Sequence, residues 1–255
     1  MDKVLCIIYT TMVVYLVLAL EATETVDLAV KHNPQNRGSA RDFVYETLRY
    51  SILHLKLKPG TKMSEQDVSD QFQVSRTPVR EVFVRLFQDE LVEIYPQRGT
   101  YVSLINLRHL EEGRFVRETM EKAVIREAAG ELSKSDLFKL ESNLAAQEVC
   151  RKNRNYFRML ALDDEFHATI FRACGMERTW STVQQLNNDF YRVRVLRLAH
   201  DFRWDTILSQ HYAIFEALKN GEGDRAEGIT QDHLRMVIVE KDELKLEYPD
   251  YFVDI

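Results

Sequence analysis

Cysteine is scarce in this sequence of 255 residues, and its three copies lie far apart. Cys6, Cys150 and Cys174 form neither the closely spaced pairs of a zinc-binding motif nor an even-numbered disulfide framework. The chain also lacks internal repeats, low-complexity linkers and a convincing small-residue cleavage site. These absences exclude a disulfide framework and a repeat array, and they favour a globular protein of the reducing cytoplasm.

Net positive charge is missing as well. The formal net charge is −6, of which −5 falls in residues 104–255 with their 22 basic and 27 acidic residues. Residues 40–103 hold nine residues of each sign and are neutral overall. The length suits two domains with an ample core. Because the second half is acidic, a polyanionic partner is expected to contact only the first half.

The most informative segment is residues 74–80, with the sequence VSRTPVR. Ser75 can cap a helix whose first turn carries Arg76, Thr77 and Arg80, with Pro78 at a position where a missing N–H group costs little. A helix N-terminus presents unpaired N–H groups to anions, and these side chains are short or cationic. The segment therefore predicts a recognition helix that meets a DNA backbone and a groove edge.

The surrounding sequence supports this prediction. Apolar spacing predicts a helix over residues 41–55, and Ser64-Glu65-Gln66-Asp67 is typical of a capping box that begins a second helix. Two β-prone runs, 91–95 and 100–103, are joined by a short turn with Gly99. Residues 40–104 are therefore expected to form a winged helix-turn-helix. Because this domain is neutral, its DNA face must gather the few cations available: Arg76, Arg80, Arg98 and Lys62.

The rest of the chain shows helical apolar spacing throughout. The predicted helices cover residues 107–132, 134–152, 156–174, 178–200, 204–220 and 224–247. Short connections between them imply antiparallel neighbours, so residues 105–248 are expected to form an all-α bundle, followed by a tail over 249–255. The fold class is thus mainly α, with an N-terminal winged helix and a C-terminal antiparallel helical bundle.

Histidine spacing in the bundle indicates a possible metal site. Asp163 and His167 lie four residues apart and share a helix face. His211 lies nine residues before the turn residue Asn220, and His233 lies nine residues after Asp224, so an antiparallel hairpin would bring the two rings to the same height. Three imidazoles and one carboxylate suit a divalent transition metal, zinc first, with nickel, cobalt or manganese as alternatives. On spacing alone, ordinary helix histidines remain an equal alternative.

Residues 41–103 resemble the winged-helix domain of the GntR family of bacterial transcription regulators. The resemblance rests on Leu57-x-Pro59-Gly60, Ser64-Glu65, the run from Val74 to Glu81, and Arg98-Gly99-x-x-Val102. It implies that Arg76 and Arg80 contact bases or phosphates, that Ser75 and Thr77 hold the DNA backbone, and that Gly99 lets the wing enter the minor groove. The sequence departs from the family at Gln66, where a basic residue is frequent, and at Asp89-Glu90-Leu91, where Glu-Gly-Leu is usual.

The second half resembles the FCD ligand-binding domain of FadR-type GntR regulators. The matching motifs are Asp163-x-x-Phe166-His167-x-x-Ile170, His211-x-x-Ile214-x-x-Ala217-Leu218 and His233. The resemblance implies that Asp163, His167, His211 and His233 coordinate a metal ion. Met176 departs from the family, which usually has a polar residue there.

A metal with open coordination positions and nearby arginines suits a small carboxylate or hydroxy-acid effector. The resemblance places Arg117 in the first bundle helix, at a position that often faces the cavity. Arg192 and Arg194 are further candidates for binding the effector. Because these two alternate along one helix, at most one of them is expected to point inward.

Together these features predict a homodimeric, ligand-responsive regulator, most simply a repressor, that binds a double-stranded DNA operator. A metal-dependent enzyme that uses the same Asp and His residues is one alternative, although no motif places a second carboxylate as general base. An architectural DNA-binding protein whose bundle only dimerises is another.

A single long apolar run, residues 4–20, stands outside this scheme. It has the length of a short transmembrane helix or a signal-peptide core. Lys3 precedes it and acidic residues follow, so the positive-inside tendency would place the DNA-binding domain on the wrong side of the membrane. We therefore expect no membrane partner and regard residues 1–39 as a non-native or disordered extension; a membrane tether is the alternative.

Overall fold

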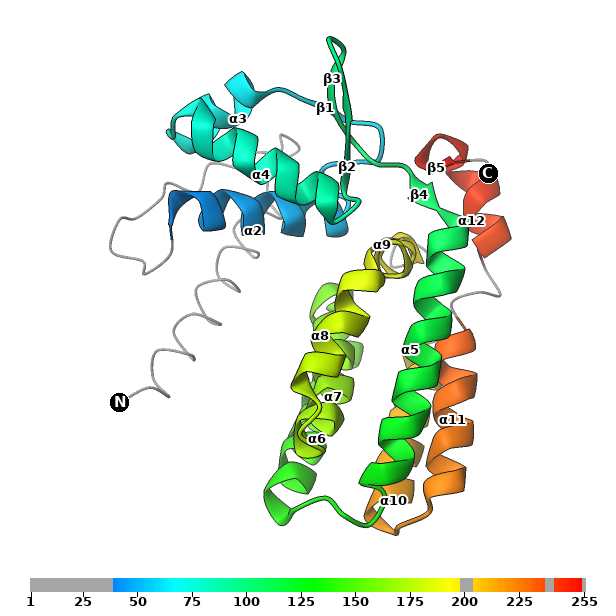
Figure 1. Ribbon diagram of the computed structural model, residues 1–255. Coiled ribbons are helices and arrows are strands. Elements are labelled where there is room, and N and C mark those ends of the chain that lie inside the picture. The colour runs from blue at the N-terminus through cyan, green and yellow to red at the C-terminus, as the bar shows by residue number, and fades with distance from the viewer. Residues whose placement is uncertain (1–38, 198–203, 237–240, 254–255) are drawn as a thin grey trace.

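The computed structural model describes residues 39–197, 204–236 and 241–253. These residues form a small mixed domain and a longer helical domain, with a short linker between them (Figure 1). The apolar run at residues 4–20, expected to belong to an extension, lies outside the described residues. Within the described ranges, no helix has both the length and the apolar character needed to cross a bilayer.

The first domain is the predicted winged helix-turn-helix. Its elements are α2 (Ala40–Leu53), β1 (Lys62–Met63), α3 (Glu65–Phe72), α4 (Arg76–Gln88), β2 (Val92–Tyr95) and β3 (Gly99–Val102). The wing has three antiparallel strands rather than the expected two, because β1 pairs with β3 in the order β1-β3-β2. A strand of two residues is too short to show the alternation by which a strand is recognised in a sequence.

Local signals set the ends of these helices. The Ser39 hydroxyl accepts a hydrogen bond from Asp42 N at 3.1 Å and begins α2, and the Ser64 hydroxyl accepts one from Asp67 N at 3.0 Å and begins α3. Gln73 ends α3 in the left-handed region, with φ 54°. The apolar faces of the three helices then meet in a core of fully buried side chains: Val44, Leu48, Ile52, Val79, Val82 and Leu86.

The second domain is an antiparallel helical bundle. It contains α5 (Leu107–Ala128), α6 (Lys134–Lys152), α7 (Tyr156–Ala173), α8 (Glu177–Leu186), α9 (Asn188–Arg197), α10 (Trp204–Lys219) and α11 (Gly223–Arg235). Helix α5 packs along α11, α6 along α7, and α10 along both α6 and α11. The mainly α fold class is therefore confirmed.

The prediction of one helix over residues 178–200 is wrong. The helix is interrupted at Asn187, and the second part, α9, turns toward the winged helix (Figure 1). A glycine accommodates this break: a Cβ atom at Gly113 of α5 would lie 2.5 Å from the backbone oxygen of Leu186 and 2.8 Å from Asn187 Oδ1. The broken helix packs against a distant helix at this point, and apolar spacing within 178–200 carries no sign of that contact.

The C-terminal segment does not form a loose tail. After α12 (Lys241–Glu247) and a short 3-10 turn (Pro249–Tyr251), strand β5 (Phe252–Val253) pairs in parallel with β4 (Ile105–Asn106) of the linker. Phe252 is buried with Ile105, Leu110 and Phe190 in a separate small core. The end of the chain thereby supports the segment that joins the two domains.

Candidate metal centre and nucleic-acid interface

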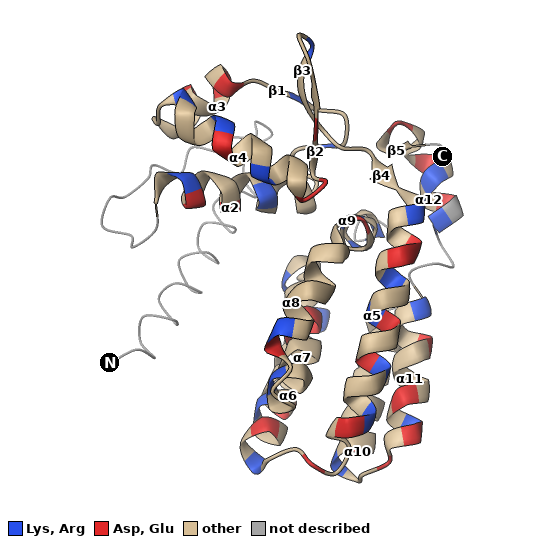
Figure 2. Ribbon diagram, in the orientation of Figure 1, with Lys and Arg blue, Asp and Glu red and all other residues tan. Residues whose placement is uncertain are grey.

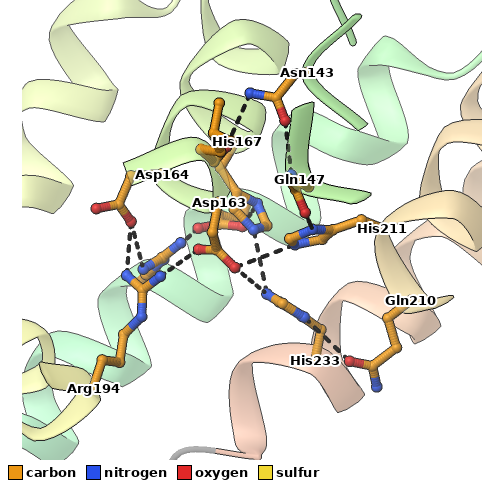
Figure 3. A network of polar contacts seen from close by, with 12 residues as sticks. Asn143, Gln147, Asp163, Asp164, His167, Arg194, Gln210, His211 and His233 are labelled. Atoms are coloured by element: carbon orange, nitrogen blue, oxygen red, sulfur yellow. Dashed lines mark hydrogen bonds and ion pairs between the residues drawn. The ribbon is translucent and has the colours of Figure 1, made fainter. Parts of the chain in front are cut away.

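The four predicted metal ligands converge inside the bundle. Helix α7 contributes Asp163 and His167, α10 contributes His211 and α11 contributes His233 (Figure 3). One ligand atom from each residue lies within 4.8 Å of all the others, and all four side chains are buried. The His211 ring and the His233 ring lie 4.7 Å apart between centroids, as the hairpin argument from the sequence requires.

An oxygen from another side chain holds each ring at its outer nitrogen, Nδ1. The pairs are His167 with Glu121 Oε2 at 2.7 Å, His211 with Gln147 Oε1 at 2.8 Å and His233 with Gln210 Oε1 at 3.2 Å. Gln147 is itself oriented, because its amide donates to Asn143 Oδ1 at 2.7 Å while Asn143 donates to Leu162 O at 3.0 Å. Since an acceptor at Nδ1 fixes the proton there, the Nε2 lone pairs face the centre of the cluster.

The inward-facing nitrogens lack good partners. His211 Nε2 is buried with no hydrogen-bond partner among the described residues, and His167 Nε2 lies 3.3 Å from His233 Nε2. Burial lowers the pKa of both His211 and His233, so their neutral, ligand-competent forms are favoured. Converging lone pairs beside a carboxylate are costly to bury unless a cation lies between them. This donor set therefore fits a divalent transition metal ion.

Asp163 is kept ionised by its surroundings. Burial alone would raise its pKa, but the Arg194 guanidinium and the neighbouring histidines outweigh burial and hold the pKa of Asp163 well below its usual range. Arg194 pairs with Asp163 Oδ2 and with Asp164 Oδ1, the latter at 2.7 Å. The other Asp163 oxygen, Oδ1, faces His211 Nε2 at 3.3 Å and His233 Nε2 at 3.6 Å.

A small cavity of about 40 Å³ adjoins the cluster. Asp163 and His233 line it together with Arg117 and Arg194, two of the arginines predicted to bind an effector. Arg117 is 3 % exposed and pairs with Glu121, yet its Nη2 atom has no hydrogen-bond partner among the described residues. A buried guanidinium with an unused donor can bind an anion that enters this cavity.

Arg192, the third predicted effector-binding arginine, does not reach this cavity. Its fully buried guanidinium donates to Ser103 O at 2.6 Å and Leu104 O at 3.2 Å, and it pairs with Asp189. Asp189 Oδ2 in turn accepts a hydrogen bond from Asn106 N at 3.1 Å. This corrects the assignment of Arg192: because its two terminal nitrogens are engaged by the linker carbonyls and Asp189, it joins the two domains instead of facing an effector.

Sequence reasoning missed the residues that surround the four ligands. Glu121, Gln147, Gln210 and Asp164 carry no motif, and only the tertiary structure places them near the cluster. For Glu121 one signal was available, namely its position four residues after Arg117, with which it pairs. Burial by itself would raise the pKa of Glu121, but Arg117 and His167 outweigh it and lower the pKa to about 2.

The predicted DNA-contacting residues lie on the outer surface of the winged helix. Arg76, Thr77 and Arg80 are exposed in the first turns of α4, and Arg98 is exposed at the tip of the wing. Figure 2 shows basic residues at the wing tip and along α4, with acidic residues interspersed. Gly99 has φ 116°, a conformation that few other residues adopt, and this lets the wing turn tightly beside Lys62.

Two details of this surface differ from expectation. Ser75 stands at the N-cap position of α4 as predicted, but this exposed residue makes no side-chain capping hydrogen bond, so the capping contact itself is absent. The recognition arginines are also engaged by α3: Arg80 Nε and Nη2 donate to the two Glu65 carboxylate oxygens, each at 3.0 Å, and Arg76 donates to Gln66. Gln66 occupies a position where the family often has a basic residue, and here it accepts a hydrogen bond from Arg76.

Comparison with known proteins agrees with both halves of the structure. Residues 40–102 match the description "Bacterial regulatory proteins, gntR family", and residues 114–236 match "FCD domain". The HTH-type transcriptional repressor RspR of Escherichia coli K12 is 35 % identical over 82 % of this chain and 92 % of that protein. The galactonate operon transcriptional repressor of the same strain is 27 % identical over 73 % of this chain and 90 % of that protein.

A solved structure gives the same fold. The E. coli McbR/YncC structure matches with a TM-score of 0.70 at 19 % identity, covering 83 % of this chain and 99 % of that one. At this identity the match concerns the fold alone. The proteins similar in sequence are named as transcription regulators, and both matching domains belong to regulators instead of enzymes.

Proposed function

This chain belongs to the GntR family of bacterial transcription regulators, with an FCD domain behind its winged helix, and we propose that it is a homodimeric repressor that responds to a small carboxylate through a metal-containing cavity. The single observation that carries the sensing part is the buried cluster of one carboxylate and three imidazoles, each oriented at its outer nitrogen. Repressors among its relatives favour repression over activation.

In this proposal Asp163, His167, His211 and His233 hold the metal, with zinc the first candidate and nickel, cobalt or manganese the alternatives. The ion would supply a fixed positive charge with Lewis-acid character. The chain's own contribution is to keep His211 and His233 neutral and Asp163 ionised, and to orient the ligand atoms before the metal binds.

The effector would be anchored by Arg117 and Arg194, which line the same small cavity as Asp163 and His233. Guanidinium groups bind carboxylates through paired, charge-assisted hydrogen bonds. A hydroxy acid would satisfy both the arginines and the metal, and one relative is named for control of a galactonate operon, galactonate being a hydroxy acid.

DNA binding would use the exposed residues of α4 and the wing. Arg76 and Arg80 would reach base edges or phosphates in the major groove, Ser75 and Thr77 would hold the backbone, and Arg98 with Gly99 would approach the minor groove. A homodimer would present two such surfaces to half-sites about one helical turn apart. Effector binding would shift the population of dimers with the correct spacing.

The metal is tested by elemental analysis of protein purified without chelators. We expect about one ion per chain in the unmodified protein and none in His233→Ala, because one of four ligands is lost. His109→Ala is the matched control, since His109 is half-exposed and lies outside the cluster. A metal-free unmodified protein that gains no thermal stability from added zinc, nickel, cobalt or manganese would contradict the proposed centre.

Sensing is tested by measuring operator affinity with and without candidate hydroxy acids, in metal-loaded and chelated protein. The operator is first selected from a random DNA pool. A ligand that raises the melting temperature and weakens operator binding only when metal is present supports the proposal. If no carboxylate shifts the melting temperature while DNA binding persists, the bundle is a dimerisation module and the protein an architectural or constitutive regulator.

A further inference from the structure

A second, larger cavity of about 220 Å³ lies where the winged helix meets the bundle. Both domains line it: α2 contributes Arg49 and Tyr50 together with its C-cap residue His54, and the bundle contributes residues of α5, α7, α8 and α9. Pockets for drug-sized ligands measure about 300–1,000 Å³, so this cavity suits a smaller molecule. Its position means that a bound molecule would touch the DNA-binding domain directly.

Arginines from both domains line this space, and one of them, Arg117, is shared with the cavity beside the metal cluster. Arg117 lines it, and its buried Nη2 atom has no hydrogen-bond partner among the described residues. Arg49, from the opposite domain, donates to Asn188 Oδ1 at a long distance of 3.4 Å. Two carboxylates line the cavity as well: Asp164 is already engaged, with Arg194 at 2.7 Å and Arg117 at 3.8 Å, and Glu46 of α2 is exposed to solvent, against the three arginines Arg49, Arg117 and Arg194. The wall therefore offers cationic donors to an anion.

The remaining wall is rich in rings. Tyr50 stacks on His54 with 3.7 Å between ring centroids, and His54 meets Tyr191 edge-on at 5.4 Å. Trp180 and Phe190 lie on the bundle side, each 5.5 Å from the Arg117 guanidinium. Flat apolar walls next to guanidinium groups suit a planar, aromatic body that ends in a carboxylate.

We propose that this interdomain cavity is a second ligand site, which binds a small aromatic carboxylate between Arg49 of the DNA-binding domain and Arg117 of the bundle. Binding at this site does not require the metal. Its effect on operator affinity rests on the proposed regulatory function, because a ligand that bridges α2 and α9 fixes the winged helix relative to the bundle. The site lies next to the metal cavity, and Arg117, Phe190 and Arg194 line both.

The chain has two tryptophans, one in the lining of each cavity, so their fluorescence can distinguish binding at the two sites. Trp180 lines the interdomain cavity, and Trp204 lines the one beside the metal cluster. The full chain with Trp204→Phe, treated with chelator, therefore reports on the interdomain site through Trp180 alone. Benzoate is the probe, and benzamide is its uncharged counterpart of the same shape.

We expect benzoate to change the Trp180 emission saturably in chelated protein, while benzamide binds at least about tenfold more weakly because it lacks the charge. Arg49→Gln should weaken benzoate binding by about tenfold, since it removes one charge-assisted hydrogen bond. Arg178→Gln is the matched control, because Arg178 is an exposed residue of α8 that does not line the cavity.

Three results would overturn the site: no saturable change of Trp180 emission with benzoate, equal binding of benzamide, or a Trp180 response that appears only in metal-loaded protein and is unaffected by Arg49→Gln. The benzoate and benzamide comparison uses no Arg49 variant, so it stands even if Arg49→Gln disturbs the domain contact. Operator affinity is then measured with benzoate in the same buffers. If benzoate binds but does not change the operator affinity, the result counts against the regulatory function and leaves the ligand site in place.

Discussion

Arg80 in the winged helix and Arg194 in the bundle are both paired with carboxylates, but in opposite surroundings. The Arg80 side chain is 69 % exposed and faces Glu65, whereas the Arg194 side chain is 10 % exposed and bridges Asp163 and Asp164. An exposed ion pair contributes little to stability because water and salt screen it. A buried pair cannot lose one partner without leaving a charge stranded in the protein interior.

This contrast separates the two tasks of the molecule. The proposed DNA-binding surface is built from side chains that could leave their partners and take phosphates or base edges instead. The proposed sensing cavity is built from side chains fixed by their neighbours, which would keep its geometry ready for a small ligand. Substitutions in the first region should therefore alter function alone, and substitutions in the second should alter stability as well.

The largest expected effect on stability is that of Arg192→Leu, because Arg192 connects α9 to the linker between the two domains. It leaves Asp189 and the Ser103 and Leu104 carbonyls without their buried donor, so the free energy of unfolding should fall by about 3–5 kcal/mol. Urea unfolding measures this, with the exposed Arg178→Leu as control. A loss no larger than that of the control would show that buried and exposed arginines are equivalent here.

The next largest effect is a pH dependence of the unfolding free energy, which arises from His54 at the contact between the two domains. His54 donates from Nδ1 to Tyr50 O at 2.9 Å and faces the Tyr191 hydroxyl at 3.0 Å, and burial lowers its pKa to about 4. A lowered pKa means that the neutral ring stabilises the fold fully above pH 6.5 and that this contribution is lost as pH falls toward 4.

Between pH 7 and pH 4, chelated wild type should therefore lose about 2–3 kcal/mol more unfolding free energy than His54→Gln, which does not titrate. Chelation removes the effect of metal release, which would otherwise fall in the same pH range. Parallel pH profiles for the two proteins would rule out His54 as a pH-sensitive contact between the domains.

The third prediction concerns the exposed side of the comparison. Arg80→Ala should weaken operator binding by about 10- to 100-fold, or about 1–3 kcal/mol, if it removes a base contact. Unfolding free energy should change by less than about 0.5 kcal/mol, because the lost Glu65 pair is exposed. Fluorescence anisotropy with labelled operator gives the affinity, and wild-type affinity in this variant would remove Arg80 from the recognition surface.

The smallest effects are expected from replacing two serines, Ser64 and Ser75, that stand at the starts of helices. Ser64→Ala should cost about 1 kcal/mol of stability because the hydroxyl caps α3, whereas Ser75→Ala should cost less than about 0.5 kcal/mol because its hydroxyl caps nothing. Ser75→Ala should instead weaken operator binding by a few fold. Thermal unfolding and anisotropy on the same samples check both; a larger stability loss at Ser75 than at Ser64 would reverse the assignment.

Sequence patterns succeeded where the signal is local or periodic. The capping motif at Ser64, the helical spacing of the bundle and the heights of His211 and His233 about their turn are all set by residues close together in the chain. They failed where a distant residue decides. The break at Asn187 packs against Gly113 in another helix with no room for a Cβ atom, and the role of Arg192 depends on the linker carbonyls at Ser103 and Leu104.

The sequence by itself determined the winged helix, the helical bundle and the four residues of the candidate metal centre, because helix periodicity puts residues at fixed spacing on one face. Only the tertiary structure decided which groups orient those residues, since Glu121, Gln147 and Gln210 reach them by packing and not by spacing. It also decided that Arg194 faces the cavity while Arg192 holds the linker, because the direction of α9 is set by the helices and strands around it.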